Sequence, residues 1–99
     1  MIKKVKLSER PQKHYSRTES QLFDLMPQGG KRISSVELTE AREAKGNWKA
    51  EYKKMVVMVT MNNLIKKIDL NQEPFVLRKE RSHYHDNVEY WIEDRRDVK

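Results

Sequence analysis

A stripe of apolar residues between positions 57 and 68 constrains this sequence more than any other feature. Apolar side chains there recur with the 3.6-residue period of an α-helix. They are Val57, Met61, Leu64, Ile65 and Ile68. The opposite side of the same helix carries short polar and cationic groups, which suit either water or a nucleic acid. These are Thr60, Asn62, Asn63, Lys66 and Lys67. We therefore expect a long helix over about residues 49–70, with the rest of the chain folded to support it.

The start of this helix is open to a second interpretation. Residues 55–59 form an unbroken apolar run that is rich in valine, which is also typical of a buried strand. We favour the helix because the helical pattern continues smoothly into residues 62–68. A helix that is buried nearly all round at its start accounts for the run, and such a start also suits a contact between two copies of the chain.

Two shorter helices are expected before the long one, because a capping pattern occurs twice. Ser or Thr is followed three residues later by Glu or Gln, the spacing at which cap and side chain satisfy each other's backbone amides. The pairs are Thr18 with Gln21 and Ser34 with Glu37. Pro27 stops the first helix and Gly46 the second. Residues 31–33 directly follow a glycine turn and are expected to form a short edge strand.

After Pro74 the periodicity changes from helical to strand-like. Apolar and polar residues alternate in two runs, which are joined by the polar residues 82–87 and so predict a β-hairpin. The inward positions are Phe75, Leu77, Val88, Tyr90 and Ile92. The opposite face of the second strand carries Trp91, which we expect to be exposed.

The composition favours an anionic partner and a single small core. The 99 residues carry a formal net charge of +6, and 36% of them are hydrophobic. The absence of cysteine excludes disulfides and thiolate zinc sites. No apolar run approaches the ~20 residues of a membrane span, and the first residues lack the apolar core of a signal peptide. We therefore expect a cytoplasmic protein without a membrane partner.

The chain divides into three expected segments. Residues 1–17 form a flexible basic arm, residues 18–94 the folded domain and residues 95–99 a charged tail. The arm has two interpretations: a solubilising tail, or an extension that touches phosphate or reaches into a groove of DNA.

The order helix, short strand, helix, turn, long helix and two-stranded hairpin resembles the winged helix-turn-helix family over residues 18–93. Residues 33–38 look like the lead into the second helix of that family, and residues 75–81 look like the first strand of its wing. The resemblance implies an α+β fold with three helices, a short edge strand and a C-terminal β-hairpin wing. It also implies that the long helix enters the DNA major groove while the wing contacts the backbone or minor groove. The short, Lys- and Asn-rich chain is similar to family members from phages and other mobile elements.

The candidate DNA-binding residues lie on the long helix and on the hairpin. Lysine neutralises phosphate, and an asparagine amide matches adenine in the major groove. The helix candidates are Lys49, Lys53, Lys54, Thr60, Asn62, Asn63, Lys66 and Lys67. Arginine suits phosphate and a narrow minor groove. The hairpin candidates are Arg78, Lys79, Arg81, His83 and His85. The competing interpretations are a merely solvated lysine face and cross-strand pairs between these arginines and Glu80, Glu89 and Glu93.

Catalysis and metal binding are not expected. His83 and His85 would point the same way on a strand, but no third ligand at a characteristic spacing completes a metal site. There is no glycine-rich phosphate loop and no nucleophile with a base at a recognisable spacing. We therefore expect no cofactor and no enzymatic activity.

The sequence favours a small, sequence-specific, double-stranded DNA-binding protein. It would act by occupancy as a transcriptional regulator or as a replication or recombination accessory, alone or as a homodimer. The alternative is a protein-interaction module that uses the same scaffold to bind or inhibit a host protein through residues 55–59 and Trp91. An RNA ligand has no aromatic motif to support it.

Overall fold

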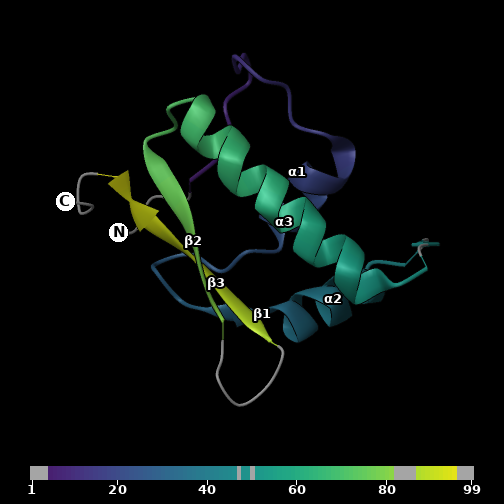
Figure 1. Ribbon diagram of the computed structural model, residues 1–99. Coiled ribbons are helices and arrows are strands. Elements are labelled where there is room, and N and C mark those ends of the chain that lie inside the picture. The colour runs from purple at the N-terminus through teal and green to yellow at the C-terminus, as the bar shows by residue number, and fades with distance from the viewer. Residues whose placement is uncertain (1–4, 47, 50, 82–86, 96–99) are drawn as a thin grey trace.

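The computed structural model describes residues 5–46, 48–49, 51–81 and 87–95. Over these residues the chain forms a small α+β domain (Figure 1). Its elements are α1 (Arg17–Asp24), β1 (Ile33–Ser34), α2 (Ser35–Ala44), α3 (Lys53–Leu70), β2 (Phe75–Arg81) and β3 (Val88–Asp94). In this part of the chain, no helix is long and apolar enough to cross a membrane. The predicted order of elements is confirmed.

The three strands form one antiparallel sheet in the order β1-β3-β2. β2 and β3 pair along their whole length, from Phe75 opposite Asp94 to Arg81 opposite Val88. β1 adds a short edge, with Ile33 opposite Tyr90. The predicted hairpin is therefore confirmed, whereas the edge strand lies at Ile33–Ser34 and not at residues 31–33. Of the expected tip at residues 82–87, residues 82–86 lie outside the described residues.

The core lies between α3, the inner face of the sheet and the two shorter helices. Of the five side chains in the predicted stripe of α3, Ile65 is half-buried and packs against the core, and the other four are fully buried. They are Val57, Met61, Leu64 and Ile68. The sheet contributes Phe75, whose ring stacks on that of Phe23 in α1 with 5.4 Å between centroids. Burying each such side chain stabilises the fold by roughly 1.5–3 kcal/mol, so the stripe is the main packing surface of the domain.

The start of α3 differs from the expectation in two ways. The helix begins at Lys53, because Tyr52 adopts a left-handed conformation with φ 53°. Residues 55–59 are helical, so the strand interpretation is wrong. The run is not buried all round either, since Met55 is 63% and Val59 is 53% exposed. Apolar side chains therefore project into solvent from the first half of α3.

The capping prediction is confirmed for α2 and shifted for α1. Ser34 and Glu37 form the predicted reciprocal cap. In α1 the cap is Ser16 with Glu19, two residues before the predicted pair, so the helix begins at Arg17. An ionised Glu19 is a stronger acceptor near a helix N-terminus than an amide would be. It is also held by α3, as described below.

Residues 5–16 run along the domain, where a flexible arm was expected. Ser8 donates from its backbone amide to Glu73 Oε2 at 3.0 Å and from its hydroxyl to Glu73 Oε1. Lys13 and Asn71 exchange two hydrogen bonds, of 2.6 and 2.9 Å. Val5, Leu7 and Tyr15 pack against the core. The described part of this segment is thus attached to the turn between α3 and β2.

Candidate functional site

α3 presents one side to solvent, which we call the α3 solvent face. It is lined at helical spacing by Met55, Val59, Asn63, Lys66 and Leu70, all of them exposed. Its character changes along the helix. The N-terminal half is apolar and is preceded by Tyr52, which is 77% exposed. Asn63 and Lys66 make the next turns polar, so on this face donors of the predicted kind occur only in the second half of the helix.

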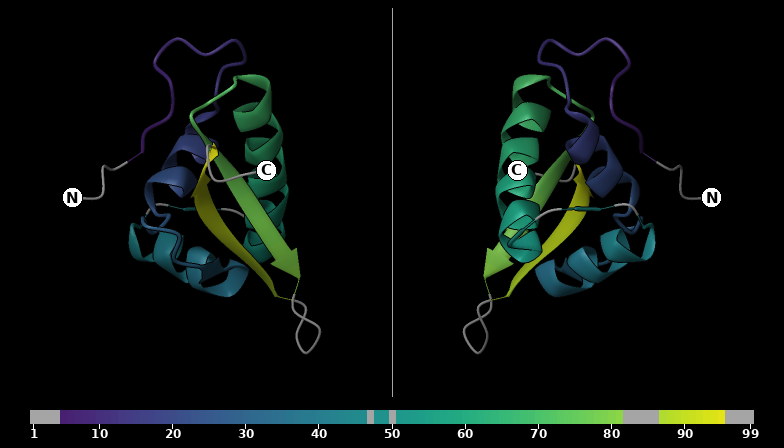
Figure 2. Two further views of the ribbon diagram at one scale, coloured as in Figure 1. Left: turned by 90° about the vertical axis from the view of Figure 1, so that its left-hand side faces the viewer. Right: turned by 90° about the vertical axis from the view of Figure 1, so that its right-hand side faces the viewer.

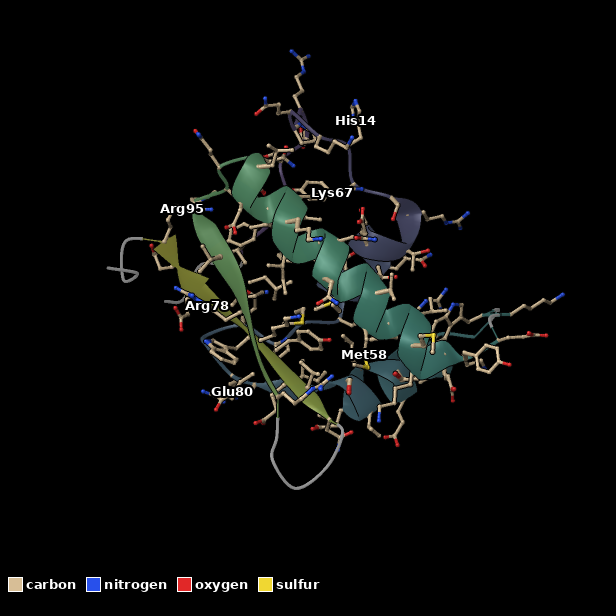
Figure 3. All side chains as sticks on the ribbon, viewed as in Figure 1. His14, Met58, Lys67, Arg78, Glu80 and Arg95 are labelled. Atoms are coloured by element: carbon tan, nitrogen blue, oxygen red, sulfur yellow. The ribbon has the colours of Figure 1, made fainter. Side chains whose placement is uncertain are left out.

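The predicted cations of β2 do not form one patch. Successive side chains of a strand point to opposite faces, so Lys79 and Arg81 follow Phe75 and Leu77 on the inner face of the sheet. Arg78 lies on the outer face, as Figure 3 shows, and its Nε is 3.4 Å from Glu93 Oε2. The competing interpretation of a cross-strand pair therefore holds for Arg78.

The inner cations of β2 extend the surface of α3. Lys79 Nζ donates to Asn62 Oδ1 at 2.7 Å, which joins the hairpin to the flank of the helix. Arg81 is exposed further along the strand, and within the described residues its side chain has no hydrogen bond or ion pair. We call this surface the α3–β2 face. Its polar members are Asn62, Asn63, Lys66, Lys79 and Arg81.

Lys67 is engaged inside the domain. Its Nζ lies 2.6 Å from Oε1 of Glu19 in α1, and the exposed fractions of the two side chains are 22% and 4%. Burial raises the pKa of Glu19, but hydrogen bonds from Lys67 and Ser16 outweigh it and hold that pKa below its ordinary value. Lys67 was predicted to contact DNA, but its ammonium group is committed to joining α3 to α1.

The remaining helix candidates lie ahead of α3 or in its first half. Lys53 Nζ is 3.5 Å from Glu43 Oε1 and 5.8 Å from the centroid of the Trp48 ring. Lys54 and Thr60 are half-buried, and Lys49 is exposed ahead of the helix. Within the described residues, none of these four side chains forms a hydrogen bond or an ion pair with β2. The hairpin candidates His83 and His85 lie outside the described residues.

Arg32 was not singled out in the sequence, yet it organises the outer face of the sheet. Its guanidinium lies 4.0 Å from the centroid of the Trp91 ring and 2.7 Å from Glu80 Oε2. A second carboxylate, that of Glu89, is 3.7 Å away. Trp91 is consequently half-buried rather than free, and its indole donates to Glu93 at 2.7 Å. The signal available in the sequence was the position of Arg32 within the predicted edge strand at residues 31–33.

The α3–β2 face combines positive charge and amide groups from two elements on one side of the domain. Lysine and arginine suit phosphate oxygens, and an asparagine amide donates and accepts at once. Among the described residues there is no group of three or more His, Cys, Asp or Glu side chains that could hold a metal ion. Comparison of the chain with protein-family models, with curated proteins and with solved structures gave no match.

Proposed function

We propose that this protein binds double-stranded DNA as a winged helix-turn-helix domain in the cytoplasm, with α3 and the β2–β3 hairpin as its reading elements. The order of elements and the sheet order β1-β3-β2 are compatible with that fold. The observation that carries the proposal is the Lys79–Asn62 hydrogen bond, because it makes helix and hairpin one surface. The protein would act by occupancy, as a transcriptional regulator or as a replication or recombination accessory.

Asn63 is the strongest candidate for reading a base. Its side chain is exposed, whereas the oxygen of Asn62 already accepts from Lys79. A free amide pairs with both major-groove positions of adenine. Lys66, Lys79 and Arg81 would neutralise phosphates on either side of it.

The exposed apolar residues of α3 fit the same mode. On the α3 solvent face, Met55 lies about two turns and Val59 about one turn before Asn63. The only apolar group that a base pair offers in the major groove is the thymine methyl. An adenine contact from Asn63 beside methyl contacts from Val59 favours a target rich in A·T pairs.

The experiment is fluorescence anisotropy of labelled duplexes over a salt series. Wild-type protein should bind a random duplex with a log–log slope corresponding to about three released phosphates. Lys79→Gln and Arg81→Gln should each reduce that slope by about one. Arg78→Gln is the matched control, because it removes the same charge from the outer face of the same strand.

The Asn63→Ala variant tests specificity separately. It should reduce the preference for A·T-rich over G·C-rich duplexes while leaving the salt slope unchanged. Absence of binding at low salt, or equal losses in Arg78→Gln and Arg81→Gln, would contradict the proposed mode.

One observation favours a second function, a protein-interaction module. Tyr52, Met55 and Val59 are 77%, 63% and 53% exposed and follow one another at the head of α3. Neighbouring exposed apolar side chains commonly mark a protein contact. Binding or inhibition of a protein partner would then use these three side chains instead of the cations of the α3–β2 face.

Val59→Lys separates the two functions. An added cation on the α3 solvent face should maintain or strengthen binding to random duplex DNA. The same change should abolish a stoichiometric complex with a protein partner, because it places a charge in an apolar interface. Loss of DNA binding in this variant would count against the DNA mode.

A further inference from the structure

A cleft of about 580 Å³ lies between α1 and the C-terminal end of α2. Figure 2 shows these two helices one above the other on the same side of α3. The charged side chains that line the cleft are Arg17, Asp24, Arg42 and Lys45. Three cations thus face one carboxylate, an excess of two positive charges. No residue of the α3–β2 face contributes to this cleft, which we call the α1–α2 cleft.

Arg42 is the buried cation of the α1–α2 cleft. It is only 8% exposed although it carries a full charge. Its Nη1 donates to the carbonyl of Gly46 at 3.3 Å and its Nη2 donates to Gln21 Oε1 at 3.1 Å. Both acceptors are neutral, and within the described residues no carboxylate forms an ion pair with Arg42. Its Nε is buried and has no hydrogen-bond partner in the part of the chain that the structure describes.

A buried charge in this state is costly. Buried ionised groups are normally paired, and an unpaired buried donor requires an explanation. The Trp48 ring, whose centroid lies 5.4 Å from the Arg42 guanidinium, supplies a cation–π contact that offsets part of the cost. It does not supply a negative charge. An anion bound in the adjoining cleft would supply that negative charge.

The two other cations of the cleft are similarly uncompensated. Arg17 and Lys45 are exposed, and within the described part of the chain neither takes part in an ion pair. They come from different elements, the first turn of α1 and the end of α2, so two helices bring them to the same cleft as Arg42. The arrangement resembles a receptor for an anion more than a solvated helix face, because its central cation is buried.

We propose that the α1–α2 cleft binds the oxyanion group, phosphate or carboxylate, of a small molecule. Its volume lies within the range of about 300–1,000 Å³ that is typical of small-molecule pockets. Arginine presents a planar set of donors that matches both kinds of oxyanion. Because the cleft shares no residue with the α3–β2 face, this ligand binds independently of the proposed DNA.

Isothermal titration calorimetry of the full chain tests this site with inorganic phosphate, pyrophosphate and succinate at constant ionic strength in chloride. Saturable binding of at least one of them is expected, and the comparison assigns the ligand to the phosphates or the carboxylates. Arg17→Gln and Lys45→Gln should each weaken binding about tenfold, the effect of losing one charge-assisted hydrogen bond. Lys31→Gln is the control, because it removes an exposed lysine from outside the cleft.

Arg42→Gln is unsuitable as the deciding variant because a buried substitution can unfold the domain, whereas Arg17 and Lys45 are exposed. Differential scanning calorimetry and circular dichroism of Arg17→Gln and Lys45→Gln verify that these two variants retain the fold. No saturable binding, or an equal loss in Lys31→Gln, would overturn the site. Displacement of the small anion by duplex DNA would also overturn it, since the cleft would then be a contact for the DNA backbone.

Discussion

Lys67 in α3 and Glu19 in α1 form an ion pair that joins the two helices, with 2.6 Å between Nζ and Oε1. The same carboxylate completes the cap of α1 by accepting from the backbone amide of Ser16 at 2.6 Å. A single side chain therefore fixes the start of one helix and the position of another. This pair explains why Lys67 cannot serve as a free phosphate contact.

Replacing Lys67 by Met should destabilise the domain by about 3 kcal/mol, because Glu19 would be left as an unpaired buried charge. Chemical denaturation at pH 7 measures the change. Lys66→Met, one residue away on the α3 solvent face, should stay within about 0.5 kcal/mol of wild type. Similar effects of the two substitutions would contradict the assigned role of the pair.

The same pair predicts a pH dependence. The pKa of Glu19 is lowered in the folded state from an ordinary value of 4.5, so its contribution is present above that pH. It is lost as the pH falls through the lower folded value. The stability difference between wild type and Lys67→Met should therefore be largest near neutral pH and shrink in acid. A difference that is constant from pH 7 to pH 3 would count against this linkage.

The buried phenol of Tyr90 predicts how the stability of the fold changes at high pH. Burial raises the pKa of Tyr90 to about 12, so the unfolded chain loses this proton first. Stability should fall between about pH 10 and 12, by at most about 3 kcal/mol from this group. Tyr90→Phe should show a weaker fall over that range, since the other titrating groups are unchanged. Denaturation curves of both proteins at pH 9 and pH 11 provide the comparison.

The left-handed conformation of Tyr52 predicts how two substitutions at this position differ in stability. Its φ of 53° is unfavourable for a residue with a Cβ, and its side chain is 77% exposed. Tyr52→Gly should therefore be about 1 kcal/mol more stable than Tyr52→Ala, because only glycine adopts this conformation without strain. Thermal unfolding of the two variants measures the difference. Equal stability would mean that the strain is relieved elsewhere.

The attachment of the N-terminal segment can be tested at Ser8. Ser8→Ala removes the hydroxyl that donates to the buried carboxylate of Glu73, so it should cost about 1 kcal/mol. Hydrogen exchange should speed up at residues 5–16 and change little in α2. Glu9→Gln alters an exposed neighbour and is expected to leave both properties unchanged.

Local patterns were sufficient to predict the elements of the fold. The buried stripe of α3 and the Ser34–Glu37 cap of α2 depend on spacing within one element, and both are confirmed. The cap of α1 was predicted two residues too late, because Ser16 with Glu19 and Thr18 with Gln21 both have the capping spacing. The ion pair of Glu19 with Lys67 favours the earlier one, and that contact joins residues 48 positions apart.

The candidate site was harder to predict because exposure depends on neighbours. Residues 55–59 read as buried, yet no described element covers Met55 or Val59. The placement of Lys79 on the inner face and of Arg78 on the outer face could have been predicted from strand alternation, because Lys79 lies two positions after the inward-facing Leu77. Nothing in the sequence marks Arg42 as buried, because its surroundings come from α1 and from the turn after α2.

The network around Arg32 has a consequence for how the molecule meets a charged partner. On the outer face of the sheet, Arg32 and Arg78 are outnumbered by the carboxylates of Glu80, Glu89 and Glu93. The inner side of the same hairpin carries Lys79 and Arg81. The two sides of the hairpin therefore differ in charge, and under the proposed DNA mode this difference should turn an approaching duplex toward the inner side before any contact forms. This orienting effect should weaken as salt shortens the range of the field.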